Sequence, residues 1–324
     1  MGENGVDQPI LRNNSSSVGH DESEQKEKIF DLERGRKFGD FYKGFMHRML
    51  DGDHSIDISS ITNQEDRILA EGMAEAASSG FKAQAIELER KQMDARSILS
   101  QVFRSPEQQK LLENTSRYAL KEHAKGVYEI DLDRNLYEEL YGRSSQATAV
   151  KIPEGISFVM IPRFSGEKNA AINEKRVAEN LPHETHHVAW RFIEKSGLLP
   201  NTEADPEMAE AFSMYRDEII AKMVTGNNPF GYDHLQNDPK RRRQIQTENP
   251  ALFAMINKAV IGANDLMEEI RDLIRRSPVR NEDLIYSAVQ SSNFQELRSN
   301  FELARDYIKK NAEPEKVTRG WEST

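Results

Sequence analysis

The chain has 324 residues, and 44 Lys and Arg against 54 Asp and Glu give it a formal net charge of −10 at pH 7. An acidic surface repels phosphate groups, so we expect no nucleic-acid partner. The sequence contains no cysteine, which excludes disulfide bonds, thiolate metal sites and cysteine nucleophiles, and any metal must therefore be held by His, Asp or Glu.

The first segment, residues 1–28, is rich in Asn, Ser, Gln, Glu and Asp and poor in large apolar side chains. Such a composition cannot repay the entropy of ordering, so we expect a disordered N-terminal arm. The arm has no apolar signal segment, and no apolar run of the chain comes near the roughly 20 residues that a membrane helix needs. We therefore expect a cytoplasmic protein without a membrane partner, while export by an unconventional route stays open.

Residues 29–145 are expected to form a helical N-terminal region. Phe and Met recur at its start at spacings of three and four residues, which predicts an amphipathic helix, and a long stretch rich in Ala, Glu, Lys and Leu follows. The predicted helices cover 29–49, ended by Gly52, and 66–102, interrupted near 78–80, and a third begins at Pro106 after the N-cap candidate Ser105.

Residues 146–312 are expected to form the catalytic region with its C-terminal helices, and residues 313–324 a flexible tail. A short, partly β-branched run at 156–161 lies between two prolines and is the one convincing strand of the chain. The predicted fold is therefore α+β and predominantly helical, with a minimal β-element around 149–162. The predicted helices of this region are 174–194, with Gly197 as C-cap, 206–224, with Asp205 as N-cap, and two or three more within 250–276 and 281–311.

The most informative motif is His183-Glu184-Thr185-His186-His187, an H-E-x-x-H pattern in a segment with helical periodicity. Residues four apart lie on one face of a helix, so His183 and His187 can bind one ion. Glu184 is offset by about 100°, which places it beside a metal-bound water, where it suits a general base. The alternative is a solvated helix face with incidental histidines. The apolar residues around the motif argue against it, because buried imidazoles without partners are costly.

A third metal ligand is expected on the following helix, where Glu218 and Glu210 are the candidates. Glu218 lies in an apolar stripe, whereas Glu210 shares its face with other polar residues. If the two helices form an antiparallel hairpin, the level of His187 corresponds to about 215–218 on the second helix. We favour Glu218 and keep Glu210 as the alternative.

These residues resemble the gluzincin metallopeptidases, which combine H-E-x-x-H on one helix with a glutamate on the next. The matching residues are His183, Glu184 and His187, with Glu218 inside R-D-E-I-I-A. The resemblance implies a zincin-like core in which these two histidines and Glu218 bind one Zn²⁺ and Glu184 activates water. It also implies that the strand at 156–161 is an edge strand that pairs with an extended substrate.

A further likeness concerns E-A-F-S-M-Y at 210–215, which is similar to the E-G-F-A-x-Y segment around the ligand glutamate of one aminopeptidase branch. This likeness is why Glu210 stays an alternative. No G-A-M-E-N-like motif occurs, so no aminopeptidase is assigned. The third histidine ligand of the metzincins is absent, since V-A-W-R-F-I follows His187.

Several other residues are weaker candidates. His186 could replace His187 or orient the site, although a partly exposed helix histidine is the favoured interpretation. Asp217 could hold a ligand histidine or be solvated. An oxyanion could be stabilised by Tyr215, Tyr232 or His234, each of which is expected instead in packing or at the surface. The basic run 240–243 is interpreted as a solvated loop or helix start.

The sequence thus predicts a zinc-dependent peptidase that hydrolyses a peptide or protein substrate, with Glu184 as base. A second hypothesis is a non-catalytic helical interaction protein with a structural or vestigial metal site, whose acidic arm recruits partners. A third is a metallohydrolase acting on a substrate other than a peptide. Metal content separates the first hypothesis from the second.

Overall fold

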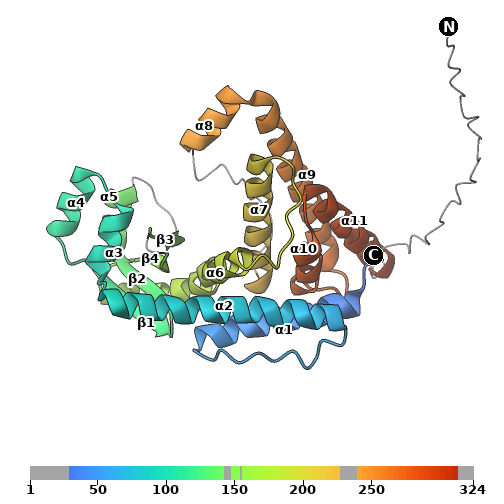
Figure 1. Cartoon of the computed structure of the whole chain (residues 1–324), viewed down its shortest axis with the longest axis horizontal. Helices are drawn as coiled ribbons and strands as arrows, with labels where there is room; N and C mark the ends of the chain where they lie inside the picture. Colours follow the sequence, from blue (N-terminus) through green and yellow to red (C-terminus); the bar gives the residue numbers. More distant parts are fainter. Residues whose placement is uncertain (1–28, 142–146, 154, 227–238, 313–324) are drawn as a thin grey trace, which may run out of the picture.

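The computed structural model describes residues 29–141, 147–153, 155–226 and 239–312. The predicted arm and tail, and the candidates Tyr232 and His234, lie outside the described residues. Within them the chain is α+β and mostly helical, as predicted (Figure 1). None of the described helices is both long enough and apolar enough to cross a bilayer.

Along the chain, most helices come either before or after the four strands of a small sheet. Short 3-10 helices, η1 (Glu167–Asn169) and η2 (Asn281–Leu284), lead into two of them. The α-helices are α1 (Leu32–Leu50), α2 (Gln64–Lys91), α3 (Ala95–Val102), α4 (Pro106–Glu113), α5 (Arg134–Tyr141), α6 (Ala170–Lys195), α7 (Pro206–Val224), α8 (Pro239–Glu248), α9 (Pro250–Ile274), α10 (Ile285–Gln290) and α11 (Phe294–Asn311).

The predicted helix ends at Gly52, Ser105 and Asp205 are confirmed. Gly52 has φ 77° just after the end of α1, a conformation that glycine adopts without a steric penalty. Ser105 forms a capping box with Gln108 at the start of α4. Asp205 accepts hydrogen bonds from the first turn of α7, which opens with Pro206.

The sheet has four strands in the order β1-β2-β4-β3: β1 (Tyr118–Ala124), β2 (Val127–Asp133), β3 (Thr148–Lys151) and β4 (Ser157–Arg163). The predicted strand at 156–161 is confirmed as β4. Its predicted place at the edge of the sheet is wrong, because β2 pairs with β4 in parallel and β3 pairs with it antiparallel. The edge beside α6 is therefore β3.

The β1–β2 hairpin lies inside the region 29–145 that is predicted to be helical, so that prediction is wrong for these residues. Gly126 has φ 85° in the turn of the hairpin, and a Cβ there would lie 2.0 Å from the carbonyl oxygen of Phe81. The residues of β1 are mostly polar and partly exposed, which hides the strand from a search for apolar runs.

The predicted break near 78–80 does not occur, since α2 is continuous to Lys91 and is followed by the C-cap Gln92, which has φ 48°. Gly80 is a packing residue instead. A Cβ at this position would lie 2.2 Å from Cγ of Phe192, so the missing side chain lets α2 and α6 approach closely.

Strand β4 separates two hydrophobic cores. Phe158 and Met160 pack into a smaller core with α3, α4 and α5, whereas Val159 and Ile161 face a larger core built from α1, α2, α6, α7 and the C-terminal helices. Figure 1 shows α6 above α2, with α7 rising from the level of α6 toward α8 and α9. Helices α1 and α2 and the sheet thus form a platform, and α6 and α7 pack against it.

Candidate metal centre

The candidate centre is formed by α6 and α7. The contacts run in opposite senses along the two helices, because Glu194 near the end of α6 accepts a hydrogen bond from Ser213, while His187, two turns earlier, meets Asp217 and Glu218. The predicted level, residues 215–218 opposite His187, is therefore confirmed. Glu210 is exposed, and it is not part of the cluster.

His183, His187 and Glu218 lie together as a group that could hold a metal ion, with one ligand atom from each within 4.8 Å of the others. The Nε2 atoms of the two histidines are 3.2 Å apart. Oxygens of Glu218 lie 3.3 Å from Nε2 of His187 and 3.8 Å from Nε2 of His183. Two nitrogens bound to one tetrahedral zinc ion are about 3.3 Å apart, so the imidazole pair already has the spacing of a chelate.

The two imidazoles differ in their protonation. Burial, with the charge of His187, lowers the pKa of His183 to about 4. Burial also acts on His187, but Asp217 and Glu218 outweigh it and hold its pKa well above the usual range. Burial would raise the pKa of Glu218, yet His187 and His183 lower it to about 2. A cation between these groups would replace the proton that His187 carries.

Asp217 is a charged neighbour of two histidines, His187 and His186. Its Oδ1 lies 2.9 Å from Nδ1 of His187 and 3.3 Å from Nε2 of His186. His186 is fully buried and stacks on Trp190, so the favoured interpretation of a partly exposed histidine is wrong. The Tyr42 hydroxyl of α1 lies 3.4 Å from Nδ1 of His186. A buried chain of side chains thus links α1 to a metal-ligand candidate.

Glu184 lies one residue beyond His183 and faces the edge strand. Burial raises the pKa of its carboxyl group, while the charge of His187 and the backbone N–H of Ala149 in β3 oppose the rise. The carbonyl oxygen of Ala149 accepts a hydrogen bond of 3.0 Å from Nη2 of Arg191. The backbone N–H of Ala149 therefore interacts with Glu184, the predicted base, and its carbonyl oxygen interacts with Arg191.

Other candidates fall outside the centre. Tyr215 is fully buried and its hydroxyl donates to Oδ1 of Asn264, in agreement with the packing role expected for it. The basic run 240–243 lies in α8, where the Arg242 guanidinium is 5.7 Å from the ring centre of Phe253. The expected helix start is therefore found.

Three residues near the centre are not found by the sequence search. Tyr42 and Ala149 come from α1 and β3, and no local motif connects them with residues 183–187. Lys222, whose Nζ lies 3.2 Å from Oε1 of Glu218, could have been noticed one turn after that residue on α7. Comparisons with protein-family models, with curated proteins and with solved structures returned no match to this chain.

Proposed function

We propose that this chain is a zinc-dependent peptidase of the gluzincin type, with a zincin-like core made by α6, α7 and the sheet. The observation that carries the proposal is the cluster of His183, His187 and Glu218, with Glu184 beside it on the same helix. Two imidazoles and one carboxylate are a common ligand set of catalytic zinc, and three protein ligands leave a position for water or substrate.

The donor set fits zinc better than harder cations. Mg²⁺ and Ca²⁺ prefer oxygen ligands, whereas imidazole nitrogen suits zinc and other transition metals. Asp217 provides the outer support that a histidine ligand of a metal usually has. His186 lies 3.3 Å from the same carboxylate, and the Tyr42 hydroxyl lies against the other ring nitrogen of His186.

The proposed reaction is the addition of water across a peptide bond, which gives one acid and one amine. Zinc, when bound, would polarise the scissile carbonyl group and lower the pKa of water. The carboxylate of Glu184 accepts the proton of the attacking water and then delivers it to the leaving nitrogen. Asp217 keeps His187 in place during these steps.

The peptide is not expected to pair with Ala149 in the manner that the family resemblance implies. Both backbone groups of this residue interact with Glu184 and Arg191. A substrate strand could use this position only by displacing the Arg191 guanidinium. Side-chain contacts must therefore contribute more to substrate binding here than backbone pairing at that position.

The test compares wild-type protein with Glu184→Gln and His183→Ala. Zinc content is measured by elemental analysis, and cleavage with a mass-spectrometric digest of a peptide library. We expect Glu184→Gln to keep about one zinc per chain and lose cleavage by at least about 10²-fold, while His183→Ala loses the metal. Glu179→Gln, an exposed change on the same helix, serves as the control. Cleavage that survives in Glu184→Gln would contradict the mechanism.

A second candidate function is supported by Lys222. Its ammonium group lies 3.2 Å from Glu218 and compensates this carboxylate when no metal is present, as expected of a vestigial site in a non-catalytic interaction protein. A folded wild-type chain that takes up no zinc would favour this alternative. Zinc uptake without cleavage of any library peptide would favour a structural site or another class of substrate.

A further inference from the structure

The face of α6 that carries the candidate base also carries positively charged residues nearer the C-terminus of the helix. Glu184, His187, Arg191 and Lys195 follow one another at intervals of three or four residues, which places them on one side of the helix. Lys195 lies about 12 Å beyond His187 along the helix axis, a distance that three to four residues of an extended peptide span.

Arg191 is the first of these cations. Its Nη2 atom is held by the carbonyl oxygen of Ala149, whereas its buried Nη1 atom has no hydrogen-bond partner. Burial lowers the pKa of Arg191, and the negative charges of Asp217, Glu184 and Glu194 counteract this without an ion pair to any of them. Within the described residues Arg191 forms no ion pair, so no direct contact neutralises its charge.

Lys195 and Lys151 are the other two cations. Burial lowers the pKa of Lys195, and the positive charges of Lys151 and Arg191 lower it further, so both groups lie near Lys195. Lys151 is exposed at the end of β3, two residues after Ala149, and Lys195 is also exposed. Neither lysine forms an ion pair in the part of the chain that the structure describes.

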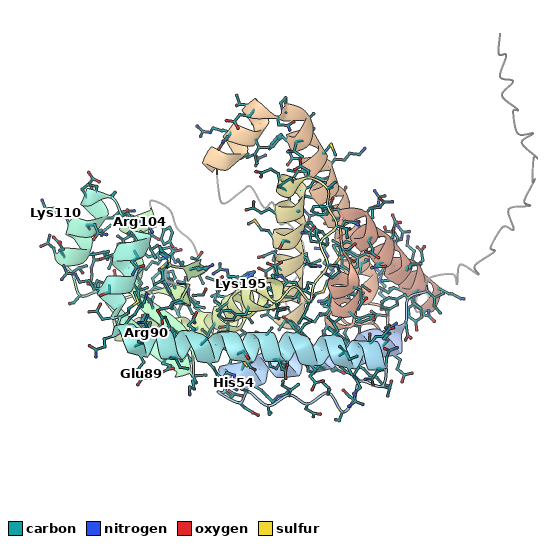
Figure 2. All side chains as sticks on the ribbon, viewed as in Figure 1. His54, Glu89, Arg90, Arg104, Lys110 and Lys195 are labelled. Atoms are coloured by element: carbon teal, nitrogen blue, oxygen red, sulfur yellow. The ribbon has the colours of Figure 1, made fainter. Side chains whose placement is uncertain are left out.

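Figure 2 shows Lys195 on the side of α6 that is turned away from α2. This side is not covered by the platform of α1 and α2. Three cations without an ion pair thus lie together on a chain with a net charge of −10, whereas Lys37, Lys121 and Arg298 each pair with a carboxylate. Their repulsion would be relieved by an anion that binds there.

We propose that Lys151, Arg191 and Lys195 form a cationic subsite that binds a carboxylate of the peptide substrate, a few residues from the bond that is cleaved. The proposal rests on the proposed function and adds a substrate class, peptides with a negative charge on one side of the cleaved bond. The carboxylate comes either from an Asp or Glu side chain or from the free C-terminus of the peptide. The two exposed lysines contact the carboxylate directly, and the half-buried Arg191 adds its positive charge.

The experiment measures peptide binding to the zinc-loaded full chain carrying Glu184→Gln, which does not consume its ligand. Four fluorescein-labelled octapeptides differ only in two Glu residues replaced by Gln and in a free or amidated C-terminus. We expect a charged peptide to bind about three- to tenfold more tightly than its neutral counterpart, with a preference that decreases as salt is added. The pair that shows the preference identifies the source of the carboxylate.

The decisive variant carries Lys151→Gln and Lys195→Gln in addition, and both changes are exposed, so folding is preserved. It should lose the preference. The matched control carries Lys110→Gln and Lys258→Gln, two exposed lysines of α4 and α9, and it should keep the preference. Equal binding of all four peptides, no measurable binding of any of them, or an unchanged preference in the Lys151 and Lys195 variant, overturns the proposal.

Cleavage of the peptide library by the wild-type chain separates this proposal from the proposed function. Cleavage sites with no enrichment of Asp, Glu or a nearby C-terminus would leave the peptidase standing and remove the subsite. Lysine-dependent binding of charged peptides without any cleavage would keep the subsite and remove the peptidase.

Discussion

Oδ1 of Asp217 lies 2.9 Å from Nδ1 of His187, on the side of the imidazole opposite to the Nε2 atom that faces His183. Asp217 is therefore an ion-pair partner of His187 on that side of the ring, and its negative charge favours the protonated or metal-bound imidazole. His183 has no such support, because its buried Nδ1 atom has no hydrogen-bond partner. The two ligand candidates of one motif are therefore unequal.

Asp217→Asn should weaken zinc binding by about 10- to 100-fold, because an amide cannot offer the same charge to His187. Competition with a zinc-binding dye measures the affinity. Asp272→Asn, an exposed change on α9, is the control. Equal affinities of Asp217→Asn and wild type would show that the carboxylate does not support the ligand.

Lys222→Met should have the opposite effect. The ammonium group neutralises Glu218 in the metal-free site, and zinc must compete with it, so its removal should tighten zinc binding by up to about tenfold. The same dye competition applies, with Lys258→Met as the control for a lost exposed charge. A weaker zinc affinity in Lys222→Met would mean that the lysine helps to organise the ligand set.

Gly80→Ala should destabilise the metal-free protein by about 1–3 kcal/mol, since the new Cβ would overlap the ring of Phe192. Urea unfolding in the presence of a chelator measures the free energy. Gly44→Ala in α1 is the matched control, because a Cβ there meets nothing closer than 3.4 Å, and it should be neutral or stabilising by up to about 1 kcal/mol. Equal effects of the two changes would refute the packing role of Gly80.

The stability of the sheet should depend on pH through Glu129, a fully buried residue of β2. Burial would raise its pKa, but hydrogen bonds from His123 and Arg163 outweigh burial, so the pKa is lowered from 4.5. A lowered pKa in the folded state adds stability above pH 4.5, and this contribution is lost as the pH falls through the folded value.

Glu129→Gln should therefore flatten the decline of unfolding free energy below pH 4.5. Urea titrations of the metal-free chain between pH 5 and pH 3 measure that slope for both proteins. Parallel slopes would show that the protonation of Glu129 is not linked to folding.

The sequence predicted which residues come together in the candidate metal cluster, because the information for it is local. His183, His187 and Glu184 follow from one helical turn, and Glu218 follows from the level of the next helix across a short loop. The caps at Ser105 and Asp205 are local in the same sense.

The features that the sequence did not predict depend on contacts between distant segments. His186 is buried because α1 brings Tyr42 against it, and residues 42 and 186 share no pattern. Gly80 resembled a helix break because its partner Phe192 lies more than a hundred positions away. The polar strand β1 is stabilised by its pairing with β2 and not by its own composition.

The interactions of Ala149 with Glu184 and Arg191 have a consequence for the protein in a crowded solution. An exposed edge strand is a template on which a second chain can add, and this is a common route to aggregation. At Ala149 in β3, side chains of α6 contact the backbone groups that an incoming strand would need. Glu184 and Arg191 thereby make this edge of the sheet less available for pairing with a second chain.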